Sequence, residues 1–217
     1  MNTIDLSMVC AGFNEPSHGS QTAFRGALEA LSHPGRVIDL VPQAEIPGGA
    51  QASASGLLLA LLDADSRLWL SPALATSNAV HWLVFHTNCS IVSNPAEADF
   101  AWIDCIETMT NLDQWQLGTD EYPDSSTTCL INVEGFENQS APTQTLVLQG
   151  PGILETQSLT IQGITAQQSS AFIKKCNENN QHFPRGIDVF LCAPQQITGI
   201  PRTSKVMSSD QSSFIKA

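Results

Sequence analysis

The chain has 217 residues, of which 42% are apolar and only 14% charged, and its formal net charge is −12. A chain of this length can bury a full core in one domain, so we expect a single α/β domain over residues 1–217, with irregular ends at 1–19 and 207–217. Its nine Lys and Arg residues argue against autonomous binding to nucleic acid or to a membrane, because such binding relies on clustered cations.

The start of the chain shows neither the basic segment nor the long apolar segment of a signal peptide, so we expect a cytoplasmic protein. Six cysteines are scattered without a C-x-x-C pair, which predicts reduced and mostly buried thiols. The familiar motifs of nucleotide-binding loops, metalloproteases and hydrolases do not occur. We therefore expect no metal site, no cofactor and no catalytic residue.

The first predicted helix covers residues 21–32. Pro34 and Gly35 should end it, because proline disfavours helical backbone in the residue before it and glycine tolerates a positive φ angle. Apolar residues recur at helical spacing along it, so we expect one stripe to face the core. The residues of this stripe are Phe24, Ala27, Leu28 and Leu31.

Beyond this helix, predicted strands and helices alternate, which is typical of a layered α/β domain. Short β-branched or apolar runs predict the strands, and longer segments with one apolar face predict the helices. Ser53 or Ser55 should cap the second helix, and Ala171 and Phe172 should point inward from the last. Strands are expected over residues 37–41, 67–70, 100–106, 127–133, 143–149, 159–161, 187–192 and 198–201, and helices over 57–63, 78–85 and 166–179.

Two arginines are candidates for binding a ligand or a partner protein. Arg25 lies beside the apolar stripe of the first helix, where its guanidinium could hold a phosphate or a carboxylate through two hydrogen bonds. A surface arginine whose stem covers the core is the alternative interpretation. Arg202 follows a predicted strand, and loops on rigid scaffolds often carry function.

Two histidines, one aspartate and two glycines complete the candidate residues. His33 and His86 both end predicted helices, where the helix dipole stabilises a protonated imidazole, so a capping role is expected beside the binding role. Asp188 opens an apolar strand and should accept backbone N–H groups, with metal binding as the alternative. Gly150 and Gly152 flank a proline and could either let the backbone approach a phosphate or form a tight turn.

Several short segments, in this order along residues 24–206, resemble the PhnH family of phosphonate metabolism. Each segment is common by itself, but the ordered set is specific. The segments are Phe24-Arg25-x-x-Leu28, Leu31-Ser32-His33-Pro34-Gly35, Leu57-Leu58-Leu59-x-Leu61-x-Asp63-x-Asp65, Leu68-Trp69-Leu70, Phe85-His86-Thr87-Asn88, Asp99-Phe100-Ala101, Leu148-x-Gly150-Pro151-Gly152-Ile153, Phe183-Pro184-x-Gly186-Ile187-Asp188 and Ile200-Pro201-Arg202-Thr203.

The resemblance implies a three-layer α/β/α sandwich with a mixed β-sheet, similar to the large domain of pyridoxal phosphate-dependent transferases but without the cofactor. It also implies a homodimer in isolation, and assembly with PhnG, PhnI and PhnJ in the core of the carbon–phosphorus lyase complex. Together with PhnG, PhnI and PhnL, such a protein is needed to make ribose 1-methylphosphonate 5-triphosphate from MgATP and methylphosphonate.

Two rival hypotheses remain beside the resemblance. The first is a stand-alone enzyme or binding protein for a small phosphorylated ligand, which would use Arg25, Arg202 and His86. The second is a pyridoxal phosphate enzyme, for which Lys174 or Lys175 would have to form the Schiff base with the cofactor.

Overall fold

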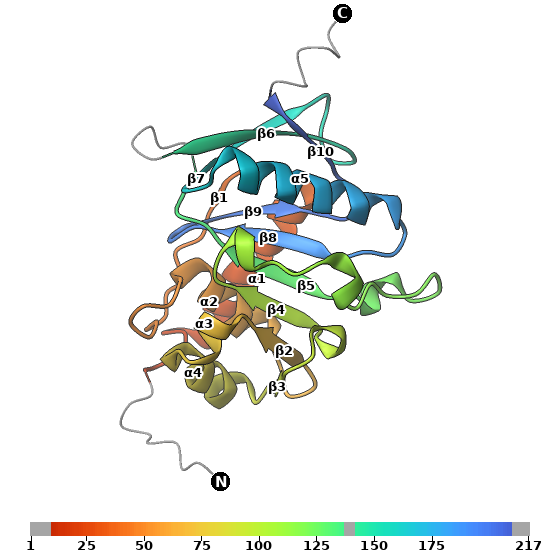
Figure 1. The fold of residues 1–217 in the computed structure, drawn as a ribbon. Helices are drawn as coiled ribbons and strands as arrows, with labels where there is room; N and C mark the ends of the chain where they lie inside the picture. Colours follow the sequence, from red (N-terminus) through yellow and green to blue (C-terminus); the bar gives the residue numbers. More distant parts are fainter. Residues whose placement is uncertain (1–9, 137–141, 210–217) are drawn as a thin grey trace, which may run out of the picture.

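The computed structural model of the chain describes residues 10–136 and 142–209. These residues form a mixed seven-stranded sheet and a smaller antiparallel sheet of three strands (Figure 1). The strand order is β1-β9-β8-β5-β4-β2-β3 in the main sheet and β10-β6-β7 in the small one. The expected α/β class with a mixed sheet is confirmed.

In the main sheet β2, β3, β4, β5 and β8 run parallel, and β9 is antiparallel to its neighbours β8 and β1. The main-sheet strands are β1 (Ile38–Asp39), β2 (Arg67–Leu70), β3 (Ser90–Val92), β4 (Phe100–Ile103), β5 (Thr128–Asn132), β8 (Asp188–Cys192) and β9 (Gln196–Ile200). The small-sheet strands are β6 (Thr143–Gln149), β7 (Gln157–Gln162) and β10 (Lys205–Ser208).

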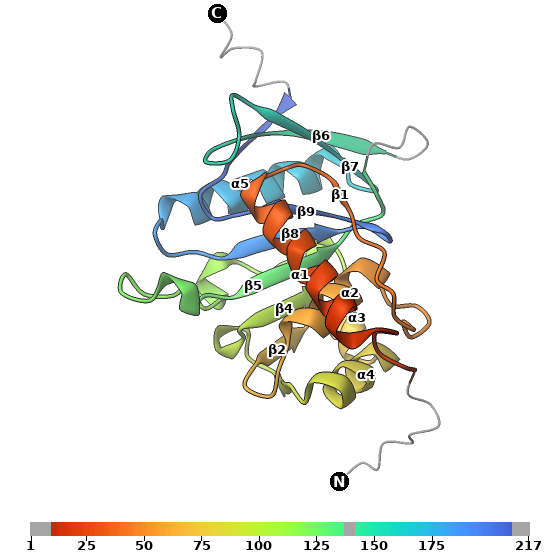
Figure 2. The ribbon, with the colours of Figure 1, turned by 180° about the vertical axis from the view of Figure 1, so that it is seen from behind.

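Helices lie on both faces of the main sheet, as Figures 1 and 2 show from opposite sides. The α-helices are α1 (Pro16–Ser32), α2 (Ala52–Leu61), α3 (Pro72–Ala75), α4 (Asn78–Thr87) and α5 (Ala166–Gln181), and the 3-10 helices are η2 (Pro95–Glu97), η3 (Ile106–Thr108), η4 (Leu112–Gln114) and η5 (Pro123–Ser125). Successive strand residues alternate between the two faces. Trp102 and Leu130 pack with α1, α2 and α4, whereas Ala101 and Ile131 pack with α5 and the small sheet.

The connections after β2 and β4 leave the main sheet on opposite faces. From β2 the chain passes through α3 and α4 to the outer strand β3, and from β4 it passes through η3 and η4 to β5. In open α/β sheets, ligands bind outside the carboxyl ends of the strands at such a switch point. This switch point lies between β2 and β4, and the carboxyl ends of the parallel strands form the edge of the sheet at which a ligand is expected.

Helix α1 packs on the sheet with a different face from the predicted one. Ala27 and Ala30 are buried, but Phe24 and Leu28 keep 47% and 53% of their surface exposed. A Cβ atom on Gly199 of β9 would lie 2.5 Å from the carbonyl oxygen of Ala30, so the close approach of helix and sheet admits only small side chains. The expectation that Phe24 and Leu28 face the core was wrong.

The start of α2 also differs from the prediction. The helix begins at Ala52, and in the described part of the chain the side chain of its N-cap residue Gln51 makes no capping hydrogen bond. Ser53 donates its hydroxyl to the carbonyl oxygen of Ala193 instead, which ties α2 to the turn after β8. The buried hydroxyl of Ser55 has no hydrogen-bond partner within the described part of the chain. The prediction that either serine caps the helix was therefore wrong.

Most other boundaries agree with the sequence, and β2 and β6 have the predicted bounds. The predicted strand at 100–106 stops at Ile103, because η3 begins at Ile106 and turns the chain away. Phe172 is buried as expected, but Ala171 is exposed on α5. Helix α1 starts within the segment expected to be irregular, and β10 reaches into the expected irregular end. Residues 1–9 and 210–217 lie outside the described part.

Candidate binding groove at the carboxyl ends of the strands

Three adjoining clefts run along the side of the molecule at which the parallel strands end. The central cleft has a volume of about 350 Å³ and lies between the ends of β4, β5 and β7 and the start of α5. It shares Ile106 and Gln168 with a cleft along α5, and Glu134, Gln162 and Pro194 with a cleft beside β1. We call the three clefts together the acidic groove, after the carboxylates that line it. They are Asp39, Asp104, Glu107 and Glu134.

The floor of the groove is held by side-chain amides. Gln51, which precedes α2, donates its Nε2 hydrogens to the carbonyl oxygens of Val133 and Cys192 at 3.0 and 2.9 Å. The indole Nε1 of Trp102, a fully buried residue of β4, donates to Oδ1 of Asn132 at 2.9 Å. These bonds fix the ends of β5 and β8 against α2, so the groove is built on rigid elements.

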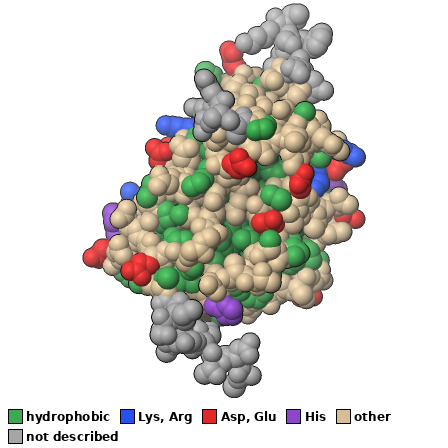
Figure 3. Space-filling view, turned by 60° about the vertical axis from the view of Figure 1, so that its left-hand side comes forward, with side chains coloured by type: hydrophobic (Ala, Val, Ile, Leu, Met, Phe, Trp, Pro, Cys, Tyr) green, Lys and Arg blue, Asp and Glu red, His purple; other side chains and the backbone are tan. Residues whose placement is uncertain are grey.

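Charge along the groove is strongly one-sided. Among the described residues that line it are the four carboxylates but only one cation, Lys175, which lies at the far end beside α5. The Nζ atom of Lys175 already donates to the carbonyl oxygen of Met109, and burial lowers the pKa of its ammonium group. Figure 3, with this side turned forward, shows acidic side chains in the middle and Lys and Arg toward the margins.

The amino termini of two helices, α2 and α5, also border the groove and carry the opposite sign. A helix amino terminus is equivalent to roughly half a positive charge. At α5 the Thr165 side chain accepts from the backbone N–H of Gln168, whose own side chain accepts from the N–H of Thr165, so this capping box occupies two free donors. Four full negative charges outweigh two such partial charges, so the groove favours cations over phosphates.

Two of the carboxylates occupy specific positions at the middle of the groove. Asp104 directly follows β4, its backbone N–H donates to the hydroxyl of Ser71, and its buried Oδ1 has no hydrogen-bond partner within the described residues. Glu134 follows β5 and lies over Gly163, where a Cβ atom would approach the carboxylate carbon to 2.3 Å. The positive φ of 75° at Gly163 further favours glycine there, which leaves room for the Glu134 carboxylate.

Arg202 and Asp188 lie together at the other end of the sheet, where β8 begins. Nη2 and Nε of Arg202 donate to the Asp188 carboxylate at 2.6 and 3.2 Å, and its Nη2 also reaches the hydroxyl of Ser126 at 2.7 Å. Asp188 accepts the backbone N–H of Arg202 as well, at 2.9 Å, in agreement with the expected structural role. The guanidinium of Arg202 is thus engaged by the protein itself.

The two candidate glycines form part of the turn between β6 and β7. Gly152 has a φ of 84°, and a Cβ atom there would lie 2.3 Å from the carbonyl oxygen of Ser32 at the end of α1. A Cβ atom on Gly150 would lie 3.0 Å from the carbonyl oxygen of Thr203. The absence of side chains therefore lets this turn approach the backbone of two other segments.

The candidate histidines and Arg25 lie apart from the Arg202–Asp188 pair. His33 is the C-cap residue of α1, and its Nδ1 is 3.3 Å from the carbonyl oxygen of Glu29. His86, in the last turn of α4, places Nε2 3.0 Å from the carbonyl oxygen of Cys10 and so holds the start of the described chain. Arg25 is exposed on the outward side of α1. None of the seven candidates lines the acidic groove.

Sequence reasoning missed the groove, although a signal for it exists. Asp104, Asn132 and Glu134 come at or just after the ends of buried strands, where polar residues commonly carry function in α/β proteins. Only the strand order shows that β4 and β5 are neighbours, which brings these side chains to one edge.

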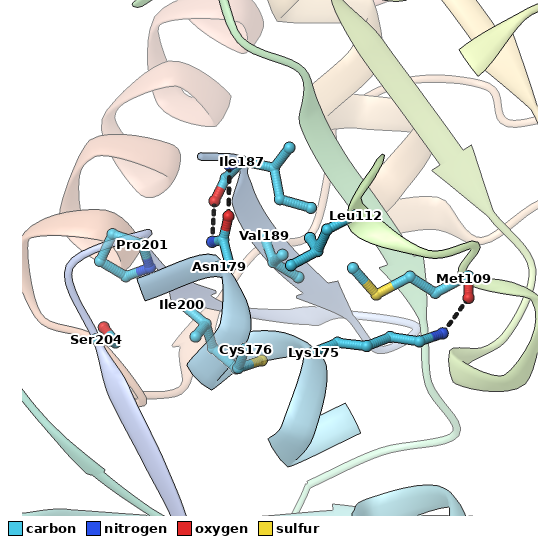
Figure 4. Close-up of a pocket in the computed structure, with 10 residues that line it drawn as sticks. All are labelled: Met109, Leu112, Lys175, Cys176, Asn179, Ile187, Val189, Ile200, Pro201 and Ser204. Atoms are coloured by element: carbon cyan, nitrogen blue, oxygen red, sulfur yellow. Dashed lines mark hydrogen bonds between the residues drawn. The ribbon is translucent and has the colours of Figure 1, made fainter. Parts of the chain in front are cut away.

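A second, much smaller cavity lies between α5 and the start of β8 (Figure 4). Its volume of about 10 Å³ can hold no more than a water molecule. Lys175 borders it, and the neighbouring Lys174 is exposed and pairs with Glu178 at 3.7 Å. Both lysines therefore have protein partners.

The six cysteines are all unpaired, and their burial predicts how they react. Burial raises the pKa of the Cys89, Cys129, Cys176 and Cys192 thiols, that of Cys176 to about 12. The thiolate is the reactive form, so a maleimide should modify only the half-buried Cys10 and Cys105 quickly in the native protein. Mass spectrometry should find two rapid additions and four more after unfolding. Rapid modification of any of the four buried thiols would contradict this expectation.

The fold is that of an α/β protein with a groove at the carboxyl ends of its parallel strands. The described residues contain no group of three His, Cys, Asp or Glu side chains that could hold a metal ion. Within those residues, no helix is both long and apolar enough to cross a bilayer. Residues 11–207 match the model of the family "Bacterial phosphonate metabolism protein (PhnH)". The chain therefore belongs to the PhnH family.

Two curated proteins show the same relationship. The chain is 34% identical over 205 residues to the alpha-D-ribose 1-methylphosphonate 5-triphosphate synthase subunit PhnH of Rhizobium meliloti (strain 1021), a match that covers 94% of this chain and 98% of that protein. It is 29% identical over 187 residues to HtxG of Stutzerimonas stutzeri, provisionally named a C–P lyase subunit protein, with 86% and 85% of the two chains covered.

Proposed function

We propose that this chain is a subunit of the carbon–phosphorus lyase complex and takes part in making ribose 1-methylphosphonate 5-triphosphate. The observation that carries the proposal is the similarity to the Rhizobium meliloti synthase subunit over almost the whole length of both chains. The partners that we propose are PhnG, PhnI and PhnJ in the core, with PhnL also needed for the synthesis, all in the cytoplasm. The protein supplies shape and contact surface there, and we assign it no catalytic residue.

The fold is compatible with a more specific architecture. We infer that the main sheet with α1 and α2 on one face and α5 on the other is a three-layer α/β/α sandwich, related to the large domain of pyridoxal phosphate-dependent transferases. The two core clusters on opposite faces of the sheet support this inference. Lys174 pairs with Glu178, and Lys175 donates to the carbonyl oxygen of Met109. These contacts give no support to a pyridoxal phosphate enzyme that would use either lysine.

The outward side of α1 is the contact surface that we propose for the homodimer or for another core subunit. Phe24 and Leu28 are one helical turn apart and both about half exposed, and Arg25 stands beside them. A helix that is apolar on two sides is normally buried on both. Its inner side already packs on the sheet, so the outer side fits a protein partner.

Replacing both Phe24 and Leu28 with glutamate should leave the fold intact and abolish this contact. Two added charges would have to be desolvated in the interface, which is strongly unfavourable. Light scattering of the isolated protein should show loss of the dimer, or affinity purification from cells that express all core subunits should show loss of the co-purified proteins. Circular dichroism checks that the variant is folded.

The matched control carries the same two charges on other exposed apolar residues, Ile91→Glu and Tyr122→Glu. This control should keep both the dimer and the co-purified subunits. The proposal for α1 fails if the two double variants behave alike. The proposed function itself fails if the tagged wild-type protein retains none of the core subunits at low salt.

The rival function, a stand-alone enzyme or binding protein for a small phosphorylated ligand, finds less support. The acidic groove repels phosphates, Arg202 is bound to Asp188, and Arg25 and His86 lie on different helices. Turnover of MgATP with methylphosphonate by the isolated protein would favour the rival function.

A further inference from the structure

We propose that the acidic groove receives an extended, lysine- or arginine-bearing segment of another subunit, with one cationic side chain meeting Asp104. The partner's identity as a complex subunit rests on the proposed function, whereas the chemistry of the groove does not.

The shape of the groove fits an extended chain. Its three clefts are joined through shared lining residues and pass from the edge strand β1, across the ends of β5 and β4, to the first turns of α5. A compact ligand would need one enclosed pocket, in which most of its surface is buried. An elongated, open surface of this kind is instead suited to a peptide segment.

The chemistry of the lining favours a segment rich in hydrogen-bond donors. Asp39, Asp104, Glu107 and Glu134 supply acceptors along its length, and the side chains between them are largely amides, which can pair with a peptide backbone. The lining amides are Gln51, Asn132, Gln162, Gln167, Gln168, Gln195 and Gln196.

Asp104 is the position at which we place the principal cation. A buried carboxylate oxygen without a partner is unfavourable, so its Oδ1 stands out among the polar atoms of the groove. Asp104 is partly exposed in the cleft, so a guanidinium or ammonium group there can compensate the charge of this carboxylate and donate to Glu134 in the same cleft. Gly163 has no side chain, which leaves room for the Glu134 carboxylate at this position.

Binding of a basic probe peptide to the isolated protein tests the chemistry. The probe is a fluorescein-labelled peptide of five Lys-Thr repeats, followed by fluorescence anisotropy. The double variant Asp104→Asn with Glu134→Gln should bind it about tenfold more weakly than the wild type, since about 1.4 kcal/mol corresponds to a factor of ten. The charge-matched control, Asp113→Asn with Glu121→Gln, alters exposed acids outside the groove and should change the affinity less than twofold.

Three outcomes would overturn the inference. Equal weakening in the groove and control variants would show that only net charge matters. Competition by free lysine at the same cation concentration would show that the groove takes a small cation. Unchanged binding in the groove variant would place the peptide elsewhere.

Affinity purification from cells that express all core subunits separates this inference from the proposed function. If the wild-type protein retains the subunits and the groove variant releases them at a lower salt concentration, the inference is supported. If both retain them equally, the groove inference fails but the subunit function stands. If the wild type retains none, the proposed function fails, and the partner named here with it.

Discussion

Replacing Arg202 with alanine should lower the free energy of unfolding by about 3 kcal/mol, because it leaves the carboxylate of Asp188 without its ionic partner in a nearly buried position. The side chains of Arg202 and Asp188 are only 13% and 21% exposed. The same change removes the hydrogen bonds of the guanidinium to Ser126 and to the carbonyl oxygen of Pro123, which attach the loop before β5 to the segment after β9. Urea unfolding followed by tryptophan fluorescence measures the loss.

Two control variants show whether burial and geometry cause this effect. Arg185→Ala breaks a much more exposed ion pair with Asp120 at 3.3 Å, so it should change stability by less than about 1 kcal/mol. Arg202→Lys keeps the charge but not the planar arrangement of donors, so its loss should lie between the two. If Arg202→Ala and Arg185→Ala have equal effects, the Asp188 pair contributes no more than a surface ion pair.

The sequence predicts local structure well where one physical signal dominates. The runs that became β2 and β6 have the predicted bounds, because each is too short for a typical helix and lies between turn residues. Asp188 also accepts one backbone N–H, that of Arg202, as its predicted structural role requires.

Other features depend on neighbours that the sequence does not identify. The apolar residues of α1 allow two faces to pack inward, and Gly199 on a distant strand decides in favour of the alanines. The acidic groove depends on strand order, since Asp104 and Glu134 meet only because β4 and β5 are adjacent. A pattern within one segment contains no information about which strand lies next to it.

The asparagines near the end of α5 are another feature that was not recognised. Asparagine is a poor helix former, because its amide competes for backbone groups. In α5 these amides bind the backbone of other segments instead. Asn177 bonds both the N–H and the C=O of Val206, and Asn179 bonds both the N–H and the C=O of Ile187. Asn180 donates to the carbonyl oxygen of Arg202. Helix α5 thereby holds the starts of β8 and β10.

Replacing Asn179 with alanine should destabilise the protein by about 3 kcal/mol, since a buried donor and a buried acceptor would each lose a partner. Asn179 is 5% exposed, and its amide bonds to the N–H and C=O of Ile187 are 2.9 and 2.8 Å long (Figure 4). A Cβ atom on Gly186 would come within 2.6 Å of Oδ1 of Asn179, so the turn before β8 is shaped around this amide.

Asn177→Ala is the matched control, because it removes the same pair of bonds from Val206 at a half-buried position. Val206 is as buried as Ile187, but Asn177 itself is only half-buried, so water can enter the place of its amide and bond the freed groups; we therefore expect a loss of about 1 kcal/mol. Urea unfolding of the two variants gives the comparison, and hydrogen exchange should show faster opening at β8 in one and at β10 in the other. Equal small losses would mean that water replaces the Asn179 amide, and that burial does not make this contact special.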